Sequence, residues 1–102
     1  MKMITAIVRP QKLQDIQTFL VTEGIERFTV ANVMGCGNQG GHTETGKKYD
    51  IEVNLLKKIK FEIEVPAENV NDIVRKIMKL CRTPRNGDGK IFVMNIPEIY
   101  GM

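Results

Sequence analysis

The sequence predicts an α+β fold in which a four-stranded antiparallel sheet carries two helices on one face. Apolar residues alternate in four stretches, as in strands, and recur at helical spacing in two others. The order is strand, helix, strand, strand, helix, strand, and each half has a proline between its first strand and its helix, Pro10 and Pro66. Such a doubled unit with right-handed crossovers gives a ferredoxin-like βαββαβ sandwich, with a single domain over residues 1–102.

The first strand is predicted over residues 2–9. Its covered face would hold Ile4, Ala6 and Val8, and its other face would hold Met3, Thr5 and Ile7. Pro10 suits the first turn of a helix, which would end at Gly24. The apolar stripe of that helix would consist of Leu13, Ile16, Phe19 and Leu20. Because the second face of the strand also carries apolar side chains, we expect other copies of the chain to cover it.

The second strand is predicted over residues 27–34 and would end at Gly35. Its buried face would hold Phe28, Val30 and either Val33 or Met34, with Thr29 on the opposite face. Five of the nine glycines then fall within residues 35–46, so the segment up to about Asn54 predicts a long loop between the second and third strands. Loops of this length are usually functional or disordered, and a flexible hairpin connection is the alternative.

The third strand is the clearest, because residues 58–65 place four charged side chains on one face and four apolar side chains on the other. Pro66 then opens the second helix. Its apolar stripe would consist of Val70, Ile73, Val74, Ile77, Leu80 and Cys81, which places the Cys81 thiol in the core. A turn-rich loop leads to a fourth strand over residues 90–94 and a short tail over residues 96–102.

Composition argues against several classes of protein. The net charge of +3 with 6% aromatic residues is too mild to indicate a nucleic-acid partner. The longest apolar run is far shorter than the roughly 20 residues of a membrane helix, and the first residues lack the layout of a signal peptide, so we expect a cytoplasmic protein. Cys36 and Cys81 have neither a CxxC partner nor a histidine at metal-ligand spacing, and structural thiols are the default interpretation.

No catalytic constellation is present in the sequence. The chain contains no serine, so a Ser-His-Asp triad is excluded, and His42 has no second histidine with which to form a metal site. A pair of Cys36 and His42 would lack an orienting third group, and a solvated loop position is the favoured interpretation of His42. We therefore expect a protein that is not an enzyme.

The stronger functional signals in the sequence indicate a site that binds anions. Residues 75–90 contain six basic side chains against the single acid Asp88, and these are Arg75, Lys76, Lys79, Arg82, Arg85 and Lys90. The dipole at the end of the second helix explains some of this excess. The sequence NGDGK at residues 86–90 suits backbone N–H groups around a phosphate, although a tight turn before a strand explains it equally well. The segment GCGNQGG at residues 35–41 could also approach a phosphate closely, without the features of a Rossmann fold or a P-loop.

Four motifs in order resemble the PII nitrogen-regulatory signalling proteins over nearly the whole chain. They are MKMITAIVRPQKL at the N-terminus, GCGNQGGHTE, KIKFEIEVP and RTPRNGDGKIFV. The resemblance implies a homotrimer that binds ATP or ADP in clefts between its subunits. It also implies a T-loop, here about residues 37–55, that docks on a target transporter or enzyme of nitrogen metabolism, and a B-loop at about residues 82–90. The protein would approach a membrane only through a target transporter.

The resemblance also implies roles for individual residues. The nucleotide would be bound by Thr29, Gly35, Gly37, Asn38, Gln39, Glu62, Glu64, Thr83, Gly87, Asp88, Gly89 and Lys90. 2-Oxoglutarate or another small anion would be held by Gln39, Gly41 and Lys58, and a Mg²⁺ ion that accompanies ATP would be held by Gln39. The target protein would be contacted by Glu44, Lys47, Lys48 and Tyr49.

Three departures from the family pattern matter for function. Ile51 stands where some members carry a modified tyrosine, and the nearby Tyr49 is displaced by two residues. Asn38 and Gly40 replace basic residues near the phosphates, and the segment 96–102 is shorter than the usual basic C-terminal segment. We therefore expect a weaker grip on ATP. The alternative function is that of a divergent PII-like regulator of a bicarbonate transporter or carboxysome system that senses ADP or AMP.

Overall fold

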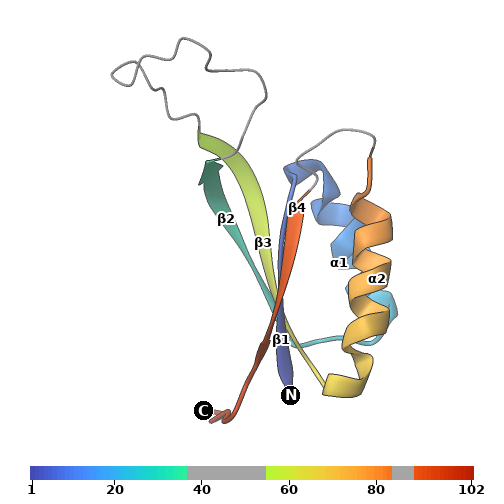
Figure 1. Cartoon of the computed structure of the whole chain (residues 1–102), viewed down its shortest axis with the longest axis vertical. Coiled ribbons are helices and arrows are strands. Elements are labelled where there is room, and N and C mark those ends of the chain that lie inside the picture. Colours follow the sequence, from blue (N-terminus) through green and yellow to red (C-terminus); the bar gives the residue numbers. More distant parts are fainter. Residues whose placement is uncertain (37–54, 84–88) are drawn as a thin grey trace.

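The computed structural model describes residues 1–36, 55–83 and 89–102. Its four strands form one antiparallel sheet in the order β2-β3-β1-β4 (Figure 1). The strands are β1 (Lys2–Val8), β2 (Phe28–Cys36), β3 (Leu55–Val65) and β4 (Gly89–Asn95). Helices α1 (Leu13–Thr22) and α2 (Val70–Cys81) lie together on one face of the sheet (Figure 1). The predicted ferredoxin-like sandwich is confirmed.

Each helix begins where its proline predicts. A short 3₁₀ turn precedes each one, Pro10–Lys12 (η1) before α1 and Ala67–Asn69 (η3) before α2. Pro66 is the N-cap residue of η3, and its backbone is extended, a conformation that the proline ring permits. After α1, Gly24 adopts a left-handed conformation with φ of 78°, which explains why the helix ends there.

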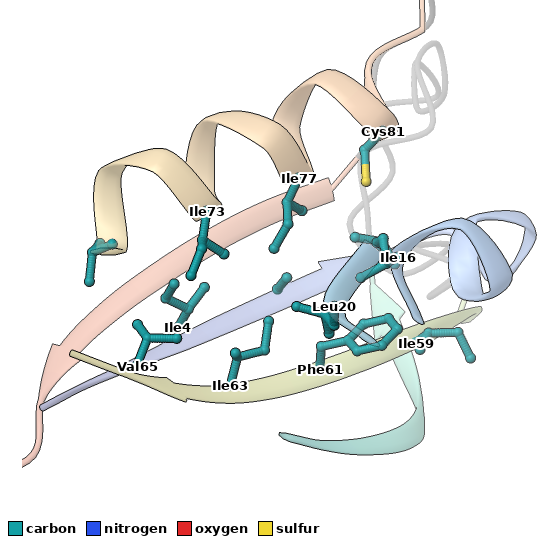
Figure 2. Close-up of a cluster of buried hydrophobic side chains, with 13 residues drawn as sticks. Ile4, Ile16, Leu20, Ile59, Phe61, Ile63, Val65, Ile73, Ile77 and Cys81 are labelled. Carbon is teal, nitrogen blue, oxygen red and sulfur yellow. The ribbon is translucent and has the colours of Figure 1, made fainter. Parts of the chain in front are cut away.

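The core lies between the helices and the two central strands, β1 and β3 (Figure 2). It consists of Ile4, Ala6 and Val8 from β1, Ile59, Phe61, Ile63 and Val65 from β3, Ile16 and Leu20 from α1, and Val70, Ile73, Ile77 and Cys81 from α2. The ring of Phe28 approaches that of Phe61, with centroids 6.3 Å apart. The predicted burial of both helix stripes, of Cys81 and of the alternating face of β3 is confirmed.

The prediction for β2 is wrong in two respects. The strand continues through Gly35 to Cys36, and Val30 and Met34 are 41% and 55% exposed instead of buried. The reason is position, because β2 lies at the edge of the sheet and β3 is its only neighbour among the described residues. Alternation in an edge strand shows which side chains share a face. Burial of that face requires another element to pack on it, and the described part of the single chain provides none for Val30 and Met34.

The predicted start of β3 is also late. The strand begins at Leu55, which is 54% exposed, three residues before the alternation becomes clear at Lys58. In that stretch, Leu55 and Leu56 are adjacent apolar residues and therefore hide the period-two pattern. The boundary proposed for the T-loop thus overlaps the first residue of β3.

Replacement of Ile77 by alanine is expected to destabilise the chain by about 2–5 kcal/mol, because it leaves a cavity in the centre of the core. Chemical denaturation at one fixed protein concentration would measure the loss. Met78 on the same helix is 45% exposed, so Met78→Ala serves as the matched control and should change stability far less. Equal losses in the two variants would contradict the core described here.

Candidate functional site

The predicted ligand residues of β2 and β3 lie on the sheet face opposite the helices, called here the open face. In β3 the residues on the helix side are buried, so the alternate residues Lys58, Lys60, Glu62 and Glu64 lie on the open face. Each of these four is partly buried in the single chain. Thr29 of β2 is the direct cross-strand partner of Glu62 and shares this face. The register therefore brings together two groups that the sequence separates by more than thirty residues.

Opposite charges occupy opposite ends of the open face. At one end, Glu62 and Glu64 of β3 pair in register with Thr5 and Met3 of β1. At the other end, Ile7 of β1 has Lys60 as its partner on β3 and Lys90 as its partner on β4. Lys58 lies beyond Lys60 toward the same end. The face thus has an acidic end and a basic end, and the basic end, with its three lysines, is the end that would attract an anion.

Gly35 and Lys58 are neighbours across β2 and β3. A Cβ atom added at Gly35 would lie 3.5 Å from Cγ of Lys58, in ordinary van der Waals contact. The missing side chain at Gly35 therefore leaves space along the stem of Lys58. Two residues that were predicted to border one ligand are thus adjacent, and their role at a ligand stays a prediction.

Gly89, at the start of β4, cannot be replaced without strain. Its φ of 142° is one that side-chain-bearing residues rarely adopt, and an added Cβ would collide with the carbonyl oxygen of Ile7. The glycine therefore allows the backbone of β4 to pass close to β1. That approach places Lys90, the next residue, directly beside Ile7 on the open face.

Thr5 is a residue of the open face that the sequence did not single out as part of a site. It is 8% exposed, and its Oγ1 has no hydrogen-bond partner within the described part of the chain. Its cross-strand neighbours are Glu62 and Phe92. A buried hydroxyl without a partner is unfavourable by about 1–3 kcal/mol, so this position favours a cover that brings a polar group. Lys60 was likewise missed, because only the register shows that it lies across Ile7 from Lys90.

The basic run at residues 75–90 is not one anion site. Lys76 Nζ lies 3.2 Å from Asp72 Oδ2 and 3.6 Å from Glu23 Oε2, and its hydrogen bond to Asp72 raises the pKa of Lys76. Lys76 thus links α2 to the end of α1, and two carboxylates offset its charge. Arg82 and Lys90 are different, because they line a groove of about 320 Å³ between α2 and β4. Thr83 is partly buried immediately after Arg82.

Several predicted site residues lie outside the described part of the chain. They are Gly37, Asn38, Gln39, Gly41, Glu44, Lys47, Lys48, Tyr49, Gly87 and Asp88, together with His42 and Ile51. Within residues 1–36, 55–83 and 89–102, no three histidine, cysteine or acidic side chains gather as a metal site would require. In the same residues the Cys81 thiol is buried, and the Cys36 thiol is exposed at the end of β2.

Comparison with known proteins identifies the family of the chain. The sequence pattern of the family described as "Nitrogen regulatory protein P-II" matches residues 1–102. The chain belongs to the P-II family. The Nitrogen regulatory protein P-II of Pyropia yezoensis is 42% identical over 99 residues, which cover 97% of this chain and 88% of that protein. The Nitrogen regulatory protein P-II 1 of Escherichia coli K12 is 41% identical with the same coverage.

These descriptions bear on two further predictions. They name P-II members as regulatory proteins and not as enzymes, in agreement with the prediction that the chain is not an enzyme. The resemblance noted from the four motifs is confirmed across the full length of the chain. Separately, none of the helices in the described residues has the length and apolar character needed to cross a membrane.

Replacement of Gly89 by alanine is expected to destabilise the chain by more than the roughly 1 kcal/mol typical of a glycine in a left-handed position. The added methyl group would meet backbone of β1 that cannot move aside without loss of strand pairing. Thermal unfolding at fixed protein concentration would measure the effect. Gly101→Ala, where an added Cβ meets nothing within 4 Å, is the control and should leave stability unchanged. A neutral Gly89→Ala would argue against the close approach of β4 to β1.

Proposed function

We propose that the P-II protein described here is a trimeric regulator that binds ATP or ADP between its subunits, with Mg²⁺ and 2-oxoglutarate as accompanying ligands. In this proposal it acts in the cytoplasm on a transporter or enzyme of nitrogen metabolism, which it contacts through residues 37–55. Membership of the family supports the regulatory role. The observation that carries the nucleotide site is the polarity of the open face, with its acidic and basic ends.

A sheet face alone is one wall of a binding site. Ligand pockets bury most of the ligand, and one sheet face covers a ligand from one side only, so a second wall must come from elsewhere. A second copy placed head to tail would bring the acidic end of one open face to the basic end of the next. Opposite charges then attract at the contact. A head-to-tail contact closes into a ring when the rotation that relates successive copies allows it. Such a ring would also cover Met3, Thr5 and Ile7.

The roles of individual residues follow from this arrangement. Lys58 and Lys90 of one copy would bind phosphates and a ligand carboxylate, with Gly35, Gly87, Asp88 and Gly89 as close backbone neighbours. Thr29, Glu62 and Glu64 of the next copy would surround the adenosine. Lys90 and Thr29 belong to opposite edge strands, β4 and β2, which a head-to-tail contact can bring together. Glu44, Lys47, Lys48 and Tyr49 would contact the target.

One observation favours a second candidate function. Residues 35–41, which border the proposed phosphate site, contain no basic side chain with which to offset a triphosphate. A site with fewer cations gains less from the third phosphate, so it would favour ADP or AMP. In that case the protein would be a divergent regulator of an inorganic-carbon transporter or carboxysome system, with bicarbonate as the second ligand.

Isothermal titration calorimetry with ATP, ADP, AMP, 2-oxoglutarate and bicarbonate would test the function. We expect Mg-ATP and 2-oxoglutarate to bind synergistically, because each would contribute contacts to the other in one cleft. A preference for ADP or AMP without a response to 2-oxoglutarate would instead support the second candidate. Failure of every adenine nucleotide to bind would refute both.

Lys90→Ala is expected to weaken nucleotide binding by about 1.5–3 kcal/mol, which is roughly a 10- to 150-fold loss of affinity. The reason is the removal of an ammonium group from a phosphate contact. Calorimetry would measure the loss, and Lys79→Ala on the exposed side of α2 is the matched control, with no expected change. Unchanged affinity of Lys90→Ala would exclude the basic end of the open face as the phosphate site.

A mixing experiment tests whether the site is shared between copies. Lys90→Ala chains and Glu62→Gln chains would each be defective alone, because each lacks one half of every cleft. When the two chains are unfolded together and refolded, mixed rings should regain some clefts with both native halves. Recovery of tight binding in the mixture is therefore expected. A site within one chain would give no recovery.

A further inference from the structure

One row of side chains crosses the open face from one edge strand to the other. Thr29 of β2 pairs with Glu62 of β3. On its other side Glu62 pairs with Thr5 of β1, which in turn pairs with Phe92 of β4. Because direct cross-strand partners point to the same face of a sheet, the carboxylate of Glu62 lies between two threonines.

The two threonines differ in their access to water. Thr29 is exposed on an edge strand, so water can satisfy its hydroxyl. Thr5 lies on a central strand and is 8% exposed, and its Oγ1 has no hydrogen-bond partner in the described residues. A buried hydroxyl in that state is unfavourable. Thr5 therefore needs a polar partner, either from a cover of the open face or from a neighbouring side chain that the cover turns toward it.

The strand register makes Glu62 the nearest acidic side chain to Thr5. The Cβ atoms of direct cross-strand partners are about 4.5–5.5 Å apart. Lys60 and Glu64, the neighbours of Glu62 on the same face of β3, lie two residues along the strand, which is about 7 Å. The chemistry of the pair is complementary, because an ionised carboxylate only accepts hydrogen bonds and a threonine hydroxyl has a proton to donate.

A cover over the open face would change the surroundings of Glu62. In the single chain Glu62 is only partly buried, so water can reach it. The head-to-tail contact of the proposed function would displace that water. A carboxylate that loses water requires hydrogen-bond donors, and a hydrogen bond with one ionised partner is about twice as strong as a bond between neutral groups. Thr5 supplies such a donor from the adjacent strand.

We propose that the Thr5 hydroxyl donates a hydrogen bond to the Glu62 carboxylate when the open face is covered, and that this bond orients the carboxylate toward the adenosine. Thr5 is thus a positioning residue, which acts on the ligand through Glu62. The inference deepens the proposed function and rests on it, because that function places Glu62 at the adenosine.

The sign of a stability change tests the hydrogen bond without any nucleotide. Valine has nearly the shape of threonine and lacks the hydroxyl, so Thr5→Val should stabilise the protein if the hydroxyl has no partner. With Glu62 as its partner, Thr5→Val should instead lower the thermal midpoint of unfolding by roughly 5 °C. Thr5→Ser keeps the donor and should lower the midpoint less.

The unsubstituted protein and the variants are compared by thermal unfolding at one fixed protein concentration. Thr18→Val, at an exposed position on α1, is the matched control and should leave the midpoint unchanged. If Thr5→Val raises the midpoint or leaves it unchanged, the proposal is wrong.

A double-mutant cycle identifies the partner of Thr5. Glu62→Met removes both carboxylate oxygens and keeps a side chain of similar length. If Glu62 accepts the hydrogen bond, Thr5→Val should lower the midpoint little further in the Glu62→Met background, so the two losses are less than additive. Additive losses would mean that the hydroxyl bonds to another group, such as a polar group of the neighbouring copy, and would overturn the proposal.

Calorimetry with ADP tests the effect on the ligand. Thr5→Val is expected to weaken binding about tenfold, the lower end of what a hydrogen bond to a charged group contributes, and Thr5→Ser should retain most of the affinity. Unchanged affinity in Thr5→Val would overturn the positioning role. If the unsubstituted protein binds no adenine nucleotide, the proposed function fails, while the unfolding cycle still decides whether Thr5 bonds to Glu62.

Discussion

The two-sided character of β3 is the constraint on which the rest of the structure depends. Its apolar residues fill the core under both helices, and its charged residues form the axis of the open face. Because side chains alternate strictly along a strand, one set cannot move without the other. A slip of one residue would place Lys60 in the core and Phe61 on the open face. The hydrophobic effect that fixes Phe61 therefore also fixes the positions of the candidate ligand groups.

The open face shows why a small domain with this sheet favours association. The buried Thr5 hydroxyl, whose Oγ1 has no hydrogen-bond partner in the described residues, is unfavourable in a single chain unless a polar group from elsewhere approaches it. Glu62 and Glu64 lie at one end of the open face and the three lysines lie at the other. The orientation of an approaching copy therefore affects the charge interactions at the contact. Like ends repel and unlike ends attract, so a contact between two open faces that aligns like ends is disfavoured. The proposed head-to-tail contact is one arrangement that brings unlike ends together and also covers Met3, Thr5 and Ile7.

Much of this fold could be predicted from sequence because its signals are local. Each signal lies within a short stretch of sequence. They are the apolar stripes of α1 and α2, the prolines before these helices and the alternation at residues 58–65. The burial of β2 could not be predicted, because burial at an edge strand depends on neighbours distant in sequence. The same applies to the site. Sequence indicated Gly89 and Lys90, but only the pairing of β4 with β1 shows why Gly89 must lack a side chain. Only the pairing of β3 with β1 shows that Lys60 lies beside Ile7.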